Sequence, residues 1–555
     1  MFKQILLPAL LIITGCGLKE NADQLLINGR IITVDEKNPY AEAVAIRDGR
    51  IVDLGSNEVI RTKYVCSRVE DLKNAVVYPG FIDAHLHMNG LGRLLMELDL
   101  TGTVSYDEVL KLVESKVQSA PHTAWIFGRG WDQNDWAVTD FPTAEKLNAC
   151  SGNYYVMLKR IDGHAILVNQ KVMDAAGITK NTPDPSGGYI IRDSQGLPNG
   201  VFIDNAMSLI YKVVPVPTRE DDSLALELAM ASCLKAGLTS VHDAGVGPEK
   251  IALYKSLSKR GKLTTRIYAM LDGSNEALIN EYFRNKRDTT DYDNFLKIVS
   301  VKLYADGALG SRGAALLEPY SDSPQHSGLA VTDPAEIERI TERALESGYQ
   351  VCTHAIGDRG NRMTLDAYEK ALKRTKTYGL DRRLRIEHAQ VLSDSDIPRF
   401  AELGVIASMQ PTHCTSDMYW AESRLGTKRI LGAYAWQRLL KNGAMICNGS
   451  DAPVESNNPL WGFYAAITRQ DHQGYPEGGW HPDQKMSAME ALRAFTINAA
   501  YASFDEREKG SIEKGKFADL VVLDHDITTV DPKEILNTSV LLTIVGGKIL
   551  YRKSP

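Results

Sequence analysis

Residues 333–354 read DPAEIERITERALESGYQVCTH, and this stretch holds one complete helix–strand unit. Asp333 is a good N-cap, Pro334 suits the first helical position, and Gly348 ends the helix. The apolar residues between them recur at helical spacing. A short apolar run follows Gly348 and predicts a strand that ends at His354. Repetition of such units is typical of an α/β fold.

Eight strands of this kind are predicted along the middle of the chain. Besides residues 349–354, the candidates are Phe81–His87, Leu238–His242, Arg266–Leu271, Ile298–Tyr304, Leu384–His388, Val405–Met409 and Met445–Asn448. Eight strands separated by helical segments predict a (β/α)8 barrel of the TIM type. The interval between the first two strands is much longer than the later ones, so we expect an inserted subdomain at about residues 90–220.

Both ends of the chain carry β-strand signals. Asp48-Gly49 separates two alternating apolar runs, which is a strong hairpin pattern. Further strands are predicted near the C-terminus, at 519–523 and 541–545. We therefore expect a small β-sandwich domain built from both ends of the chain, with the barrel between its two parts. The expected bounds are 22–78 and 506–555 for the sandwich and 79–505 for the barrel.

The composition is that of a folded globular protein, with 555 residues, 44% hydrophobic and 24% charged. A net charge of −7 without a dense basic run argues against nucleic acid as a partner. No apolar stretch of the sequence approaches the ~20 residues that a membrane-spanning helix needs. Six cysteines besides Cys16 are scattered without CxxC pairs, so they predict no disulfide framework.

The first residues differ from the rest of the chain. Lys3 precedes an almost unbroken apolar run, Ile5–Ile13, which is typical of a secretory signal peptide. Ile13-Thr14-Gly15-Cys16 resembles the bacterial lipobox, in which cleavage precedes a lipidated cysteine. We expect residues 1–15 to be removed and Cys16 to anchor an exported protein to a membrane, facing the periplasm or the cell exterior, by lipid alone. The alternative is a generic apolar leader with a chance cysteine.

Residue types that bind metals lie at five of the predicted strand ends. His85 and His87 alternate along one strand, which places both imidazoles on one face about 7 Å apart. Alone, such a pair is more often structural. Four other strand ends carry further candidates: Lys302, His354, His388 and Asp451. Since the C-terminal ends of barrel strands meet at one mouth, we expect these side chains to converge.

Lys302 interrupts an apolar strand. An ammonium facing a barrel interior is costly unless it is neutralised or paired. The functional interpretation is a neutral amine that captures carbon dioxide, forming a carbamate whose two oxygens bridge two metal ions. The alternative is a lysine on the outer face of the barrel.

These motifs resemble those of the amidohydrolase superfamily, and within it the group that includes the N-substituted formamide deformylases. The matching segments occur in family order, at residues 79–87, 301–312, 353–358, 386–390 and 448–453. The resemblance covers nearly all of residues 22–553. The combination of segments is highly specific, although no single segment is.

The resemblance implies two zinc ions bridged by carboxylated Lys302, with the other ligands divided between them: His85, His87 and Asp451 for one ion, His354 and His388 for the other. A hydroxide activated by the metals would attack the scissile carbonyl, and Asp451 would serve as general acid and base. Iron, manganese or nickel in place of zinc, and a one-metal site without a carboxylated lysine, stay open.

Four more residues are candidates for substrate contacts: His164, Arg312, His413 and Trp131. A histidine could orient the substrate or stabilise a tetrahedral oxyanion. Arg312 could receive an acidic group of the substrate, and Trp131 could line an apolar pocket. Each has a structural alternative, which is a hydrogen-bonded packing histidine, an arginine paired with an acid, or an aromatic residue in a core.

The sequence therefore predicts a metal-dependent hydrolase that cleaves a C–N bond of an amide, formamide or N-acyl small molecule. Two alternatives stay open. One is a deaminase or a cyclic amide or lactone hydrolase of the same superfamily, and the other is a non-catalytic, membrane-tethered binding lipoprotein. The sequence decides neither the substrate nor whether copies of the chain associate into a homo-oligomer.

Overall fold

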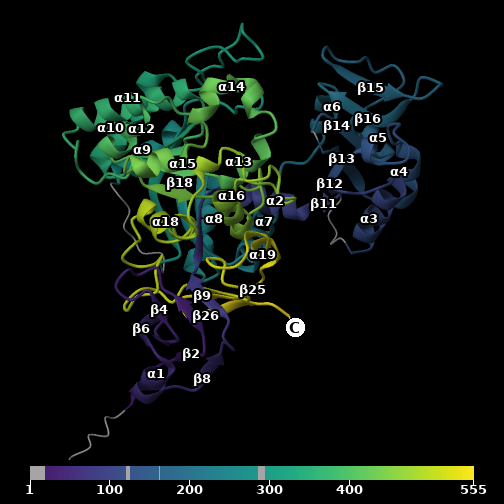
Figure 1. The fold of residues 1–555 in the computed structure, drawn as a ribbon. Coiled ribbons are helices and arrows are strands. Elements are labelled where there is room, and N and C mark those ends of the chain that lie inside the picture. Colours follow the sequence, from purple (N-terminus) through teal and green to yellow (C-terminus); the bar gives the residue numbers. More distant parts are fainter. Residues whose placement is uncertain (1–18, 120–124, 162, 286–293, 555) are drawn as a thin grey trace, which may run out of the picture. The chain divides into compact units, whose positions relative to one another are not determined.

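The structure, a computed structural model, describes residues 19–119, 125–161, 163–285 and 294–554 (Figure 1). The chain divides into two compact units, one formed by Met1–His87 with Met230–Pro555 and the other by Met88–Ala229. The predicted leader and Cys16 lie outside the described residues. Within the described ranges, no helix combines the length and the apolar character needed to cross a membrane.

The larger unit contains a nearly closed barrel of eight strands, so the predicted α/β barrel is confirmed. Each strand is parallel to its neighbours, in the order β10-β17-β18-β19-β20-β21-β22-β23. The bounds are β10 Phe81–Leu86, β17 Leu238–Val246, β18 Arg266–Asp272, β19 Leu296–Tyr304, β20 Gln350–Ala355, β21 Arg385–His388, β22 Ile406–Met409 and β23 Ile446–Asn448.

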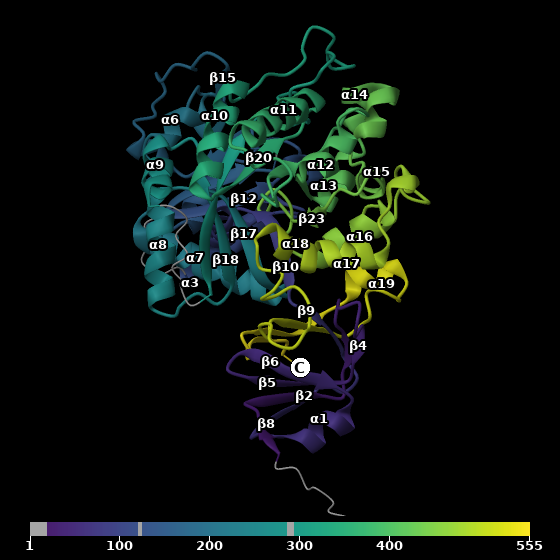
Figure 2. The same ribbon diagram turned by 90° about the vertical axis from the view of Figure 1, so that its left-hand side faces the viewer.

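The helices between the barrel strands include α8, α9 and α10, which lie outside the strands in Figure 2. The bounds are α8 Pro248–Lys259, α9 Glu276–Arg284, α10 Pro334–Ser347, α11 Asp358–Arg374, α12 Ile397–Leu403, α13 Pro411–Asp417, α14 Ala421–Arg429, α15 Trp436–Lys441, α16 Pro459–Thr468, α17 Ala488–Ala494 and α18 Ile497–Ala502. Helix α10 begins and ends as its sequence predicts. The Asp333 carboxylate accepts the N–H of Ala335, and Gly348 ends the helix with φ 80°.

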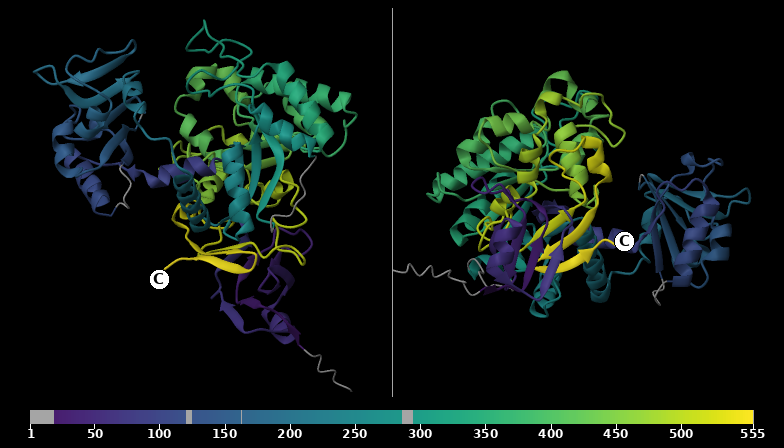
Figure 3. Two further views of the ribbon diagram at one scale, coloured as in Figure 1. Left: turned by 180° about the vertical axis from the view of Figure 1, so that it is seen from behind. Right: turned by 60° about the horizontal axis from the view of Figure 1, so that its bottom comes forward.

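The larger unit has two further main sheets, one built from N-terminal strands and one that combines strands from both ends of the chain. One has the order β6-β5-β2-β8 and the other β26-β25-β24-β9-β3-β4. Apolar residues of both sheets share one core, and the C-terminal strands lie beside the N-terminal ones (Figure 3). The bounds are β2 Gln24–Ile27, β3 Arg30–Ile32, β4 Tyr40–Ala41, β5 Ala43–Arg47, β6 Arg50–Gly55, β8 Arg68–Asp71, β9 Val76–Pro79, β24 Leu520–Leu523, β25 Val540–Val545 and β26 Lys548–Arg552; short elements beside them are β1 Glu20–Asn21, β7 Tyr64–Val65, α1 Asn57–Lys63 and α19 Pro532–Asn537.

The smaller unit has its own mixed sheet, in the order β11-β12-β13-β14-β16-β15. Its strands are β11 Leu98–Asp99, β12 Trp125–Trp131, β13 Tyr155–Arg160, β14 Ala165–Val168, β15 Gly188–Arg192 and β16 Pro198–Asp204, and its helices are α2 Met88–Met96, α3 Tyr106–Ser119, α4 Ala144–Cys150, α5 Gln170–Ala175 and α6 Met207–Tyr211. Helix α7, Arg219–Lys235, runs from this unit into the larger one.

Candidate active site

The ends of strands β10 and β23 bring three predicted ligands together. His85 lies on β10, His87 directly follows it, and Asp451 lies in the loop after β23. Oδ1 of Asp451 is 3.6 Å from Nε2 of His85 and 3.3 Å from Nε2 of His87. One donor atom from each of the three residues lies within 4.8 Å of the others, and this grouping could hold a metal ion.

Asp83 and Gly449 explain how these strand ends approach so closely. The buried carboxylate of Asp83 accepts the backbone N–H groups of His85 and Ser450, each at 3.0 Å, and the Ser450 hydroxyl at 2.5 Å. A Cβ atom at Gly449 would lie 2.5 Å from the backbone nitrogen of His85. Only glycine therefore fits at this crossing without displacing the backbone.

The carboxylate of Asp451 is surrounded by imidazoles. Burial alone would raise its pKa, but His87, His85, His388 and His413 together hold the pKa well below its usual range. Asp451 is therefore ionised at neutral pH, which is the form that binds a metal or accepts a proton.

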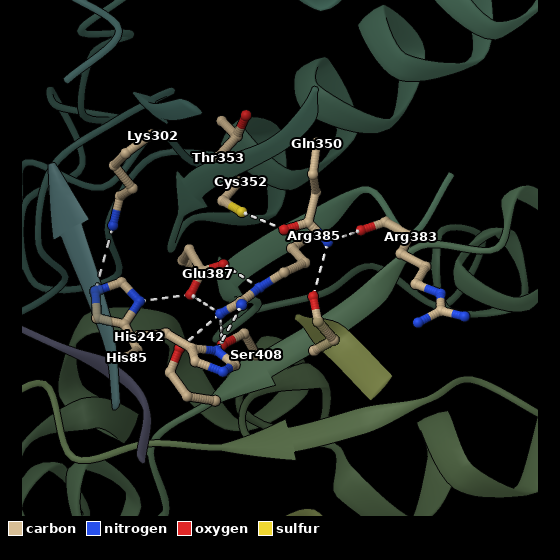
Figure 4. Close-up of polar contacts among 12 residues, drawn as sticks. His85, His242, Lys302, Gln350, Cys352, Thr353, Arg383, Arg385, Glu387 and Ser408 are labelled. Carbon is tan, nitrogen blue, oxygen red and sulfur yellow. Dashed lines mark hydrogen bonds and ion pairs between the residues drawn. The ribbon is translucent and has the colours of Figure 1, made fainter. Parts of the chain in front are cut away.

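Lys302 reaches the same place from strand β19. Its side chain is buried, and Nζ is 3.3 Å from Nε2 of His85 (Figure 4). Burial lowers the pKa of Lys302, although the carboxylates of Glu387 and Asp451 oppose the shift. Lys302 therefore faces the interior and not the outer face of the barrel, and its neutral amine is favoured by the surroundings.

His354 on β20 and His388 at the end of β21 complete the predicted set. Their ring centroids are 4.5 Å apart, and the His388 ring is 5.0 Å from that of His85. Nδ1 of His388 lies 2.8 Å from Oε1 of Gln410, an acceptor, so Nδ1 carries the proton and Nε2 keeps its lone pair. Nε2 of His354 is buried, makes no hydrogen bond among the described residues and lies 3.7 Å from Oδ1 of Asp306.

His85 and His354 are neutral at neutral pH, whereas at His87 the contact with Asp451 outweighs burial and raises the pKa. Burial lowers the pKa of His85 to about 4 and that of His354 to about 3, with Lys302 adding to both shifts. Neutral imidazole is the form that binds metal ions. The donor set, and the buried Nε2 of His354 that makes no hydrogen bond, therefore fit a metal centre better than a packed polar core.

His413, expected as a substrate contact, lies beside the candidate ligands His388 and Asp451. It is on α13, its ring is parallel to that of His388 at 5.9 Å, and its Nε2 is 3.7 Å from Oδ2 of Asp451. Donor atoms of His388, His413 and Asp451 also lie within 4.8 Å of one another. This nitrogen is buried without a hydrogen-bond partner among the described residues, so it can face either a substrate atom or a metal.

Two other expected substrate contacts, Arg312 and His164, are each paired with an acidic residue. Arg312 binds both oxygens of Asp322, at 3.1 and 2.9 Å, and Asp322 also pairs with Arg424. His164 belongs to the smaller unit, where its Nδ1 is 2.7 Å from Oδ1 of Asp204.

Trp131 lies where the alternative interpretation places it, in a core. This residue is 1% exposed in the apolar core of the smaller unit, and its indole N–H donates to the carbonyl of Leu158 at 2.9 Å. Such a side chain fills the core of the unit and has no surface to offer a substrate.

Two functional candidates do not follow from the sequence motifs. Arg385 and Glu387 precede His388 on β21 and are fully buried behind His85 (Figure 4). The signal that could have revealed them is a pair of opposite charges at alternate positions of a short strand that ends at a candidate ligand, His388.

Comparison with known proteins agrees with this geometry. The model of the Amidohydrolase family matches residues 68–551. The chain belongs to this family. The amidohydrolase is 35% identical to Protein LONG AFTER FAR-RED 3 of Arabidopsis thaliana, over 96% of this chain and 92% of that protein. It is 29% identical to N-substituted formamide deformylase of Arthrobacter pascens, over 96% of this chain and 99% of the relative.

A solved structure is also similar to this chain over most of its length. The crystal structure of an uncharacterized metal-dependent hydrolase from Pyrococcus horikoshii OT3 has a TM-score of 0.74 and 29% identity, covering 92% of this chain and 99% of that one. The amidohydrolase is therefore a hydrolase that acts on C–N bonds other than peptide bonds.

Proposed function

We propose that this amidohydrolase cleaves the C–N bond of a small amide, formamide or N-acyl compound at a divalent metal centre. The observation that carries the proposal is the convergence, at five strand ends, of six residues of metal-binding type, one of which is the ionised carboxylate of Asp451. The likeness to N-substituted formamide deformylase supports this substrate class.

The proposed ligands are those that the strand ends bring together. His85, His87 and Asp451 would hold one ion, His354 and His388 a second, and carboxylated Lys302 would bridge the two. Imidazole and carboxylate ligands suit zinc. When bound, the metal centre would polarise the substrate carbonyl and lower the pKa of water.

The protein's own groups would then handle the proton and the developing charge. Oδ1 of Asp451 faces His85 and His87, whereas Oδ2 faces His413. Asp451 would accept a proton from the attacking water and deliver it to the leaving nitrogen. A proton on Nε2 of His413 would let this residue donate a hydrogen bond to the substrate oxygen as negative charge develops there.

The variant Asp451→Asn tests the mechanism. General acid–base groups contribute about 10²–10⁴-fold to rate, so turnover should fall at least by this factor while metal content is largely kept. The assay is amine, formate and ammonia release from a panel of formamides, N-acyl amino acids, lactones and aminated heterocycles, with metal measured in the same samples. Asp394→Asn, which removes a surface carboxylate paired with Arg438, is the control. Full activity of Asp451→Asn would contradict the mechanism.

We also propose that the protein is exported and anchored by a lipid on Cys16. The basis is the sequence of residues 1–16 alone. In a bacterial host, Cys16→Ser should move the protein from the membrane fraction to the soluble fraction. Equal membrane recovery of both forms would contradict the anchor.

A further inference from the structure

A row of polar side chains lies in the barrel interior behind His85 (Figure 4). Glu387 and Arg385 come from β21 and His242 from β17, and all three have no exposed surface. A buried ion pair seldom adds stability beyond what apolar residues of similar size would provide. Its presence behind a candidate metal ligand therefore needs an explanation other than packing.

Glu387 connects Arg385 to His85. Oε2 of Glu387 is 2.5 Å from Nδ1 of His85. Arg385 donates to both oxygens of the same carboxylate, from Nε to Oε1 at 2.8 Å and from Nη2 to Oε2 at 3.0 Å. A bidentate pair of this kind fixes the plane as well as the position of the carboxylate.

The remaining contacts of Arg385 join it to three other strands. Nη2 donates to the carbonyl of Ala84 on β10 at 2.6 Å and to the hydroxyl of Ser408 on β22 at 2.9 Å. Nη1 is 2.9 Å from Nδ1 of His242 on β17. The guanidinium cannot move without breaking contacts to these strands, so Glu387 is held by the barrel as a whole.

The contact with Glu387 determines which ring nitrogen of His85 carries the proton. Arg385 donates to both oxygens of the Glu387 carboxylate, and this bidentate geometry is the one a guanidinium makes with an ionised carboxylate. An ionised carboxylate only accepts hydrogen bonds, and Nδ1 of His85 therefore carries the ring proton. The lone pair is left on Nε2, which is 3.3 Å from Nζ of Lys302 and 3.6 Å from Oδ1 of Asp451.

We propose that Glu387 is a positioning residue that holds His85 in the tautomer and orientation that bind a metal ion, and that Arg385 holds Glu387 in place for this task. A carboxylate behind a ligating histidine also makes the imidazole a stronger ligand. The inference rests on the proposed function, because it requires His85 to be a metal ligand. Glu387 acts through His85 and touches no substrate.

A second arginine–carboxylate pair, which includes no histidine, provides a control for the test. Arg383 lies just before β21 and binds both oxygens of Glu506, from Nη1 at 2.8 Å and from Nη2 at 3.0 Å. Glu506→Gln therefore removes a carboxylate from an arginine of the same chain segment. It changes no contact of His85.

The test is the zinc affinity of the full-length protein, measured by competition with a chromophoric chelator. Glu387→Gln should bind zinc about 10- to 100-fold more weakly than the wild type. Glu506→Gln should bind as tightly as the wild type, and Glu387→Asp, which keeps the charge, should recover part of the loss. The melting temperature of each zinc-free variant separates a loss of affinity from a loss of folding.

The zinc affinities distinguish failure of the inference from failure of the proposed function. Equal zinc affinities of a folded Glu387→Gln variant and the wild type would overturn the inference alone, whereas a wild type that binds no divalent metal would overturn the proposed function with it. If the single variant does not fold, R385Q/E387Q replaces it, because this double variant leaves no buried charge unpaired. If that variant also fails, ¹⁵N NMR of the zinc-free wild type decides, with His85 assigned by comparison with His85→Gln. A proton on Nε2 of His85 would overturn the inference.

Discussion

The backbone N–H of Asp451 donates a hydrogen bond of 2.7 Å to the carbonyl oxygen of His85. The N–H of His87 bonds in turn to the carbonyl of Ala452 at 2.8 Å. These two bonds join the ends of β10 and β23, the first and last strands of the barrel sheet. The closure of the barrel and the spacing of three proposed ligands therefore depend on the same backbone contacts.

Gly449→Ala should damage this junction. The new Cβ would lie 2.5 Å from the backbone nitrogen of His85 and 2.8 Å from Oδ1 of Asp83, neither of which can move freely. We expect the free energy of unfolding to fall by about 1–3 kcal/mol, with a loss of bound metal. Urea denaturation and metal analysis measure the two effects. Gly55→Ala is the control, since nothing lies within 4 Å of its Cβ position; equal behaviour of both variants would refute the argument.

Lys302 should be carboxylated in the metal-loaded protein. Its neutral amine would attack carbon dioxide, forming an N–C bond and releasing a proton to solvent. Because burial lowers the pKa of Lys302, the reactive neutral form is populated more than in an exposed lysine. Metal-free protein reconstituted with ¹³C-bicarbonate should show a ¹³C carbamate signal and take up more metal than in carbon-dioxide-free buffer. The signal should vanish in Lys302→Gln, and its absence from the wild type would favour a site without the carbamate.

Trp131→Phe should weaken the smaller unit and leave the reaction unchanged. The substitution leaves the buried carbonyl of Leu158 without its indole donor, at a cost of about 1–3 kcal/mol. Trp136→Phe is a matched variant, because Trp136 packs in the same core and donates to the carbonyl of Thr103 at 3.0 Å. Both variants should lower the thermal stability by a similar amount, and both should keep the KM of the wild type. A rise in KM specific to Trp131→Phe would restore the substrate role expected from the sequence.

The barrel could be predicted because its strands are short apolar runs with clear ends. The predicted strand Leu384–His388 differs from β21 by one residue, and the cap residues of α10 were predicted individually. The convergence of the candidate ligands could be predicted for the same reason, since the position of a residue at a strand end determines where it lies in a barrel.

The remaining parts of the site depend on information that a local pattern does not contain. Arg385 and Glu387 share one face of β21, and alternating charges usually indicate a face toward solvent. This face of β21 points to the interior because the sheet closes into a barrel. The position of His413 depends on how α13 is oriented, and the burial of Trp131 depends on the packing of a whole unit, so residue type alone indicates neither.

Strand β9 pairs antiparallel with β24, with Pro79 opposite Leu520. The two partners are 520 − 79 = 441 residues apart in the chain. At ribosomal rates of about 5–20 residues per second, β9 is made on the order of tens of seconds before its partner. Until β24 has been synthesised, the edge of β9 that pairs with it is unpaired. Unpaired strand edges promote aggregation. A cell that makes this enzyme in good yield must therefore protect the nascent N-terminal segment from aggregation.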